Sequence, residues 1–272
     1  LYCDGRTIGT FQFESTGMKE FLRKLQPKNF NDLYAAVALF RPGPMDNIDA
    51  FIERKNGADV TYIVPELEPI LKETYGIIVY QEQIMQIAQI YSGFTFADAD
   101  IFRKAISKKD RNEILKMKAS FINGAIKKGH KEQEADILFE QILKFANYGF
   151  NKSHAVSYAM IACKEAYLKC KYPLQFYSSI LDQQYGSNDV KFSKYLAEIK
   201  KMGIKVHLPD INHSTLRFIS YDNGLLMPLL GISNMQTKTI YNIVEDRENH
   251  GEYTSFVDFV VRMLRTKDKI SE

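Results

Sequence analysis

The sequence lacks several features that would place it in large classes of protein. No stretch approaches the roughly 18 uncharged apolar residues that a membrane-spanning helix needs, and the N-terminus has no basic segment followed by an apolar one, as a signal peptide would. The first residue is Leu1 and not Met, so we expect a piece of a longer protein. A cytoplasmic protein with no membrane partner is predicted.

Cysteine is scarce as well, and three residues do not make an extracellular disulfide framework. Cys163 and Cys170 stand in one predicted helix, where their spacing puts the Cα atoms about 10 Å apart, too far for a disulfide. Neither has a His or a second Cys at metal-ligand spacing, so a zinc site is not expected. We predict reduced thiols in the core.

The familiar enzyme motifs are also missing: the sequence contains no GxxxxGK[ST], GxSxG, HExxH or GxGxxG after a strand. Without a phosphate-binding loop, a nucleotide hydrolase is poorly supported. Asp98 and Asp100 resemble a two-carboxylate metal site, but positions two apart on a helix point to nearly opposite sides, and Asp98 has capping spacing to Thr95. No metal ligand is predicted in this chain.

What is present is a strong helical pattern. The 272 residues are 45% hydrophobic and 25% charged, which allows a substantial core in one large or two smaller domains. After about Gly203 the pattern changes to short strands around the turn signal Asp222-Asn223-Gly224. The predicted fold class is mainly α, with many helices over residues 1–204 and a small β hairpin and helical hairpin over 205–272. Helices are predicted at 33–40, 66–74, 80–91, from Phe96, from Asp110 to a stop at Gly129, and at 131–146, 153–171, 174–183, 188–202 and 256–264.

The run at 145–154, FANYGFNKSH, is the most informative for chemistry. A helix start offers unpaired N–H groups and positive partial charge, which suit a phosphate, and Lys152 adds a full charge. Tyr148 or Phe150 could supply a flat face for a base or sugar. The alternative, which the residues alone favour, is that Ser153 caps the helix while the rings pack in the core.

A second candidate is the basic run at 103–118, RKAISKKDRNEILKMK, in a chain whose net charge is only +3. Lys108 lies one helical turn beyond Lys104, so a ladder of cations on this helix could meet a triphosphate or a DNA backbone. A solvated basic surface explains the run equally well.

Several runs together resemble one family, the alpha subunits of bacterial DNA polymerase III, which are C-family replicative polymerases. The runs are GTFQFES at 9–15, ALFRPGP at 38–44, YQEQIM at 80–85, FRKAISKK at 102–109, YGFNKSH at 148–154 and KYP at 171–173. Their order and spacing cover nearly the whole chain. The resemblance implies that residues 1–204 are the fingers domain and that 205–272 include a degenerate helix-hairpin-helix segment.

The resemblance also implies a DNA-directed DNA polymerase, a nucleotidyltransferase. In such enzymes palm carboxylates, expected outside this chain, hold Mg²⁺, so the chain is expected to have no catalytic residue or cofactor of its own and to be inactive alone. Implied partners are primer-template DNA and dNTP, with a sliding clamp and replisome subunits bound through other parts of the protein. A stand-alone, non-catalytic helical DNA-binding or scaffolding module is the rival hypothesis.

The family's nucleotide-binding positions fall on residues of the two runs above. The paired triphosphate cations correspond to Arg103 and Lys104, where Lys replaces the common Arg and loses its bidentate geometry. The wall around the base and sugar corresponds to Tyr148, Lys152 and His154. The His154 ring is expected to crowd a ribose 2′-hydroxyl.

DNA contacts are assigned to Arg41, Lys108 and Lys109. The family's helix-hairpin-helix touches DNA through a Gly-x-Gly turn, but here the glycine positions are Asn234 and Gln236. Asn tolerates a left-handed conformation, whereas Gln hinders close approach to a phosphate. DNA binding by this segment is therefore expected to be weakened or lost.

Overall fold

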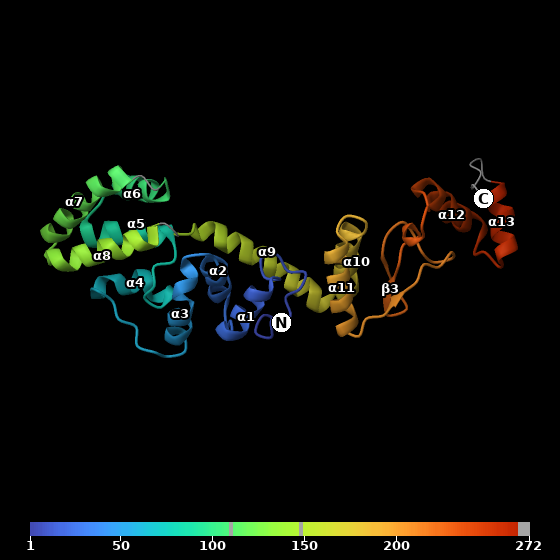
Figure 1. Cartoon of the computed structure of the whole chain (residues 1–272), viewed down its shortest axis with the longest axis horizontal. Helices are drawn as coiled ribbons and strands as arrows, with labels where there is room; N and C mark the ends of the chain where they lie inside the picture. The colour runs from blue at the N-terminus through green and yellow to red at the C-terminus, as the bar shows by residue number, and fades with distance from the viewer. Residues whose placement is uncertain (109–110, 147–148, 266–272) are drawn as a thin grey trace. The chain divides into compact units, whose positions relative to one another are not determined.

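The computed structural model describes residues 1–108, 111–146 and 149–265 (Figure 1). Two compact units divide the chain, an N-terminal unit of Leu1–Cys163 and a C-terminal unit of Lys164–Glu272. Helices dominate both, so the mainly α fold class is confirmed. The boundary after residue 204 rests on a change of sequence pattern, and it stays a prediction.

The N-terminal unit contains most of the helices. They are α1 (Thr16–Leu25), α2 (Phe30–Leu39), α3 (Ile48–Lys55), α4 (Glu68–Leu71), α5 (Gln81–Ser92), α6 (Phe96–Lys108), α7 (Arg111–Lys127), α8 (Glu132–Ala146) and the first part of α9 (Lys152–Lys171), with 3-10 turns η1 (Pro44–Asn47), η2 (Pro65–Leu67) and η3 (Lys72–Thr74).

Helices α5 to α8 pack on one another at one end of this unit (Figure 1). Aromatic rings fill the space between them: Phe102 stacks on Phe139 with 5.7 Å between centroids, and Phe121 lies 5.5 Å from Phe139. All three side chains are fully buried, and rings of this size dominate the free energy of a core. This packing fixes α6, which carries the first part of the basic run, against α7 and α8.

Capping residues explain where α6 begins. Thr95 Oγ1 accepts the N–H of Asp98 at 3.1 Å, and the Asp98 carboxylate accepts the N–H of Thr95 at 3.3 Å, so the predicted capping pair is confirmed. Asp98 is therefore occupied as a cap and is not a free metal ligand. The corresponding prediction for Asp110 lies outside the described residues.

One helical prediction needs correction, and two helices were not predicted. The helix expected at 66–74 is broken into η2, α4 and η3, because Pro65 and Pro69 restrict the backbone and Tyr75 ends the segment in a left-handed conformation. Helices α1 and α3 are additional. Helix α1 has a local signal, since the Ser15 hydroxyl caps it by accepting the N–H of Met18.

The C-terminal unit holds the rest of α9, α10 (Pro173–Gln184), α11 (Asp189–Lys201), β1 (Val206–His207), β2 (Ile219–Tyr221), β3 (Gly224–Leu226), the 3-10 turn η4 (Leu229–Gly231), α12 (Thr237–His250) and α13 (Phe256–Leu264). Asp222 and Asn223 both have positive φ, as a tight hairpin turn requires, so the predicted hairpin forms. It is part of a three-stranded sheet in the order β1-β3-β2, in which Val206 pairs with Leu225 in parallel. A strand of two residues has no recognisable alternation, which is why sequence analysis misses β1.

The cysteines are free thiols, as predicted, but not all are in the core. Cys163 is partly buried, which raises the pKa of its thiol, whereas Cys170 is exposed.

In the part of the chain that the structure describes, no helix combines the length and apolar character needed to cross a membrane.

Candidate functional site

The start of α5 connects the two stretches that the sequence singles out. Gln81 Nε2 donates to the carbonyl of Gly149 at 3.0 Å, and Gln81 Oε1 accepts from Arg103 Nη1 at 3.4 Å. The backbone adds a parallel bridge between Tyr80 and Phe150, in which the Gln81 N–H donates to the Phe150 carbonyl at 3.0 Å. One residue of α5 thus contacts both the basic helix α6 and the segment that leads into α9.

The next residue, Glu82, holds the start of α9 itself. Its carboxylate accepts the backbone N–H of Lys152 at 2.9 Å and the Asn151 side-chain amide at 3.0 Å. Asn151 Oδ1 accepts the N–H of His154 at 2.8 Å, so the cap is Asn151 and the prediction of a Ser153 cap is wrong. The positive end of α9 therefore already binds an anionic group, the carboxylate of Glu82.

Arg103 and Lys104 share one carboxylate. Asp100 Oδ1 lies 2.7 Å from Arg103 Nη2, and Asp100 Oδ2 lies 2.7 Å from Lys104 Nζ. Hydrogen bonds from Lys104 and Arg103 lower the pKa of Asp100. The two cations thus lie side by side on one face of α6, held there by an acid one turn earlier.

Lys152 points its ammonium at Glu73, which lies in η3. The Nζ atom is 2.7 and 2.8 Å from the two Glu73 oxygens, and it also lies 5.6 and 5.8 Å from the ring centroids of Tyr80 and Tyr34. The Tyr34 hydroxyl donates to Glu73 at 3.3 Å. Burial and the nearby Glu73 raise the pKa of Tyr34 to about 12, so this hydroxyl keeps its proton near neutral pH.

Arg41 and His154 line a common hollow of about 510 Å³. The Arg41 guanidinium lies 4.1 Å from the Phe150 ring centroid, and burial lowers its pKa. His154 lies beside the same ring at 5.2 Å and beside Tyr158 at 3.8 Å between centroids. The other lining residues are Gln12, Glu14, Ser15, Met18, Val37 and Phe40. The lining thus combines aromatic rings with one guanidinium, one imidazole and one carboxylate.

The predicted site residues therefore fall into two neighbouring groups. Arg103, Lys104 and Lys152 belong to the hydrogen-bonded network around Gln81 and Glu82, while Arg41 and His154 belong to the hollow beside Phe150. Lys108 is exposed at the end of α6. Tyr148 and Lys109 lie outside the described residues.

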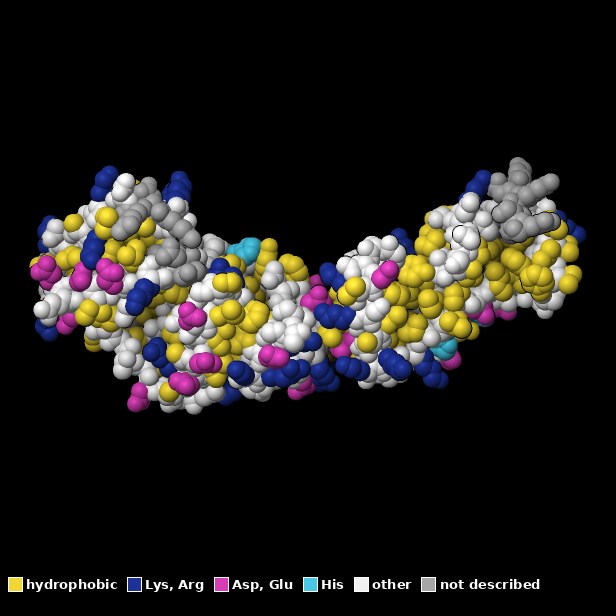
Figure 2. Space-filling view, viewed as in Figure 1, with side chains coloured by type: hydrophobic (Ala, Val, Ile, Leu, Met, Phe, Trp, Pro, Cys, Tyr) yellow, Lys and Arg dark blue, Asp and Glu magenta, His cyan; other side chains and the backbone are white. Residues whose placement is uncertain are grey.

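The cations of the basic run also meet acids from other helices. Lys118 Nζ lies 2.7 Å from carboxylates of both Asp136 and Glu140, which belong to α8. On the face drawn in Figure 2, basic and acidic side chains are interspersed over the N-terminal unit. The local positive surface expected from this run is thus partly neutralised by charges whose approach sequence spacing does not show.

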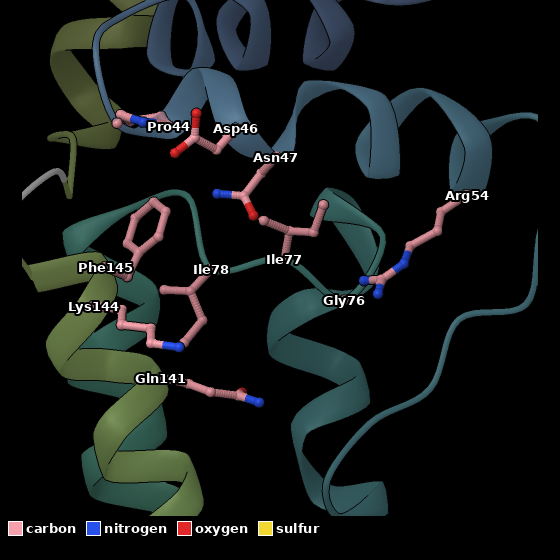
Figure 3. Close-up of a pocket in the computed structure, with 11 residues that line it drawn as sticks. Pro44, Asp46, Asn47, Arg54, Gly76, Ile77, Ile78, Gln141, Lys144 and Phe145 are labelled. Carbon is pink, nitrogen blue, oxygen red and sulfur yellow. The ribbon is translucent and has the colours of Figure 1, made fainter.

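A separate hollow of about 490 Å³ lies between η1 and α3 on one side and the end of α8 on the other (Figure 3). Arg54 and Lys144 contribute to opposite parts of it, and Arg54 Nη1 donates to the Tyr75 carbonyl at 3.1 Å. None of the predicted site residues that the structure describes lines this hollow.

The segment before α12 has part of the backbone conformation that the resemblance to a helix-hairpin-helix implies. Asn234 has a φ of 64°, in the left-handed region that glycine would favour. Gln236 is extended and precedes the first residue of α12. The resemblance implies a glycine at this position, where the sequence has Gln236.

Comparison with known proteins places both parts of the chain. Residues 1–129 match the bacterial DNA polymerase III alpha subunit finger domain, and residues 203–271 match a helix-hairpin-helix motif. DNA polymerase III subunit alpha of Borreliella burgdorferi is 44% identical over 96% of this chain and 23% of its own length. The corresponding subunit of Aquifex aeolicus is 44% identical over 98% of this chain and 23% of its own length, and that of Staphylococcus epidermidis is 42% identical over 97% and 25%.

The chain thus spans about a quarter of the length of these curated relatives. The runs that carry the resemblance include the residues that the structure links through Gln81 and Glu82. The chain belongs to the family of bacterial DNA polymerase III alpha subunits, and its first 129 residues match that family's finger domain.

Proposed function

We propose that the chain binds the triphosphate of an incoming dNTP within a DNA-directed DNA polymerase, through Arg103, Lys104 and Lys152. Tyr148 and His154 shape the pocket for the base and sugar. The proposal is supported above all by the contacts of the α5 start, which join the cations of α6 to the first residues of α9. The positive charges of these three side chains suit the negative charge of a triphosphate.

The same proposal assigns the remaining chemistry to other parts of the protein. Palm carboxylates outside this chain would hold Mg²⁺, which supplies the nucleotidyl-transfer chemistry. This chain's part is to neutralise and orient the phosphates, so it has no polymerase activity alone. Primer-template DNA contacts Arg41, Lys108 and Lys109, and a sliding clamp and other replisome subunits bind elsewhere on the protein.

The triphosphate role is tested by single-nucleotide incorporation in the polymerase subunit that contains this chain. Replacing both Arg103 and Lys104 by Ala is expected to raise the dNTP concentration needed for half-maximal rate and to slow incorporation. Each lost charged contact is worth about 1.5–3 kcal/mol, or roughly 10- to 150-fold. Lys127→Ala, at the far end of α7, is the matched control. Unchanged kinetics in the double variant would refute the assignment.

The same assay examines His154 with ribonucleotides. Its ring lies against Phe150 and Tyr158, so its effect on the sugar is steric. His154→Ala is expected to incorporate ribonucleotides more readily relative to deoxyribonucleotides. If the ratio of ribonucleotide to deoxyribonucleotide incorporation stays at the wild-type value, His154 does not select the sugar. That outcome would not affect the proposed triphosphate contacts.

A further inference from the structure

The cations of the proposed nucleotide site already bind carboxylates of the same chain. Asp100 accepts from both Arg103 and Lys104 on α6. Glu73 binds the ammonium of Lys152 through both of its oxygens, at 2.7 and 2.8 Å. A phosphate that approaches these cations therefore meets negative charges at hydrogen-bonding distance from them, and like charges repel.

Of these two acids, Glu73 is the better one to test, because replacing it does not alter ion pairs within a single helix. Asp100 is one turn from its partners on the same helix, whereas Glu73 reaches Lys152 from a position 79 residues away. The Glu73 and Lys152 side chains are 27% and 33% exposed. Water and a small anion can thus reach the pair, although neither side chain is free in solvent.

We propose that Glu73 sets the affinity of the anion site, because its carboxylate must release the Lys152 ammonium before a phosphate takes the same donors. The inference rests on the proposed function. Lys has three N–H donors, and Glu73 presents an oxygen to two of them. A phosphate that accepted only the third would lie beside an ionised carboxylate, so either route weakens binding.

The Tyr34 hydroxyl fits this role. It donates to Glu73 at 3.3 Å, so a hydrogen-bond partner remains for the carboxylate when Lys152 turns to a phosphate. The rings of Tyr34 and Tyr80 lie 5.8 and 5.6 Å from the ammonium and can hold it near the site in both arrangements. Glu73, itself bound by Tyr34, thus holds the Lys152 ammonium when no phosphate is bound.

The experiment titrates the 272-residue chain with inorganic tripolyphosphate at several salt concentrations, by calorimetry. Glu73→Gln removes the negative charge and nearly preserves the shape of the side chain. It is expected to bind tripolyphosphate about two- to fivefold more tightly than wild type, the range of a partly solvated ion pair. Its affinity is also expected to fall more steeply with salt, because one more free cation takes part.

Two further variants separate this effect from general charge and from structure. Glu68→Gln removes a charge from the same segment, where Glu68 pairs with Lys72 at 3.5 Å, and is expected to change affinity much less. In the double variant Glu73→Gln with Lys152→Met, the gain is expected to disappear, as a double-mutant cycle requires for coupled residues. Melting curves confirm that each variant is folded at the assay temperature.

The outcomes distinguish the two proposals. If Lys152→Met and Arg103→Ala weaken binding but Glu73→Gln does not strengthen it, or strengthens it equally without Lys152, Glu73 has no affinity-setting role. If none of the cation variants changes binding, or no variant binds tripolyphosphate, the proposed nucleotide site itself is wrong, and the inference fails with it.

Discussion

The first three residues of α5 each make different contacts. Gln81 and Glu82 contact the segments of the candidate site, whereas Gln83 has a structural role. Gln83 Oε1 accepts the N–H groups of Val79 and Tyr80 at 2.8 and 2.9 Å, and its Nε2 donates to Ile70 O and Thr74 Oγ1. The side chain is buried, so loss of the amide leaves four polar groups without this partner. Gln83 therefore fixes the segment from which Gln81 and Glu82 project.

We predict that Gln83→Leu lowers the free energy of unfolding by about 2–6 kcal/mol, because two buried N–H groups lose their acceptor at roughly 1–3 kcal/mol each. Urea unfolding followed by circular dichroism measures the change. Gln86→Leu, on the exposed side of the same helix, is the control and is expected to stay within about 0.5 kcal/mol of wild type. Equal effects of the two substitutions would show that the buried amide is not needed.

At this scale, the candidate cations stand out in the sequence and Asp100 lies at helical spacing from two of them, whereas the partners of Lys152 do not stand out. Lys152 stands out because a cation at a helix start suits a phosphate, whereas Arg103 and Lys104 stand out as the start of a basic run and through the family resemblance. Glu73 and Glu82 contact Lys152 from 79 and 70 positions away, and spacing along the chain carries no information about such contacts. These two glutamates are therefore recognised as partners of Lys152 only in three dimensions.

Among the elements, the crossing of α5 and α7 depends on a glycine. A Cβ atom at Gly124 would lie 2.1 Å from the carbonyl oxygen of Ser92, which is backbone and cannot rotate away. Gly124 lies inside α7, where replacement by Ala ordinarily stabilises a helix by about 1 kcal/mol. The close approach reverses that sign here.

Gly124→Ala is expected to lower the melting temperature and to cost about 1–3 kcal/mol of stability, as overpacking does in a tight core. Asn123→Ala, the exposed neighbour in α7, is expected to be neutral or slightly stabilising, since Ala is the better helix former. Differential scanning calorimetry compares the two. A higher melting temperature for Gly124→Ala would mean that α5 and α7 do not approach so closely.

Helix starts and turns are predictable from the sequence where their cause is local. A strand that depends on a distant partner is not. The reciprocal cap of Thr95 and Asp98 and the turn at Asp222 and Asn223 contain their own hydrogen-bonding or conformational cause, so sequence analysis finds them. Strand β1 exists only because Val206 pairs with Leu225. A strand of two residues is too short to show alternating hydrophobicity, and its partner β3 comes later in the sequence.

At the scale of the whole molecule, each unit has its own buried core. In the N-terminal unit the core extends from Phe13 to Ala162, and in the C-terminal unit a separate cluster includes Leu229, Ile240 and Ile243. Units with separate cores need not unfold in one step, so each unit has its own free energy of unfolding, and the effects expected for Gln83→Leu and Gly124→Ala are on that of the N-terminal unit. Two buried lysines, one in each unit, allow this to be examined.

Lys55 and Lys169 are matched probes, each with a side chain only 3% exposed. Lys55 Nζ lies 3.4 Å from Asp32 and donates to the carbonyls of Leu25 and Gln26, whereas Lys169 Nζ lies 3.1 Å from Glu198. Removing one partner of a buried ion pair costs about 3–5 kcal/mol, because the other charge is left buried without compensation.

We therefore predict that Lys55→Met speeds amide hydrogen exchange in core peptides of residues 1–163 and leaves those of 164–265 near wild type, and that Lys169→Met does the reverse. Mass spectrometry of peptides at sub-denaturing urea concentrations reads both regions in one experiment. The reason is that each substitution destabilises only the core that surrounds its lysine. Faster exchange in both regions from either single substitution would show instead that the two cores open as one cooperative unit, although their buried contacts form separate clusters.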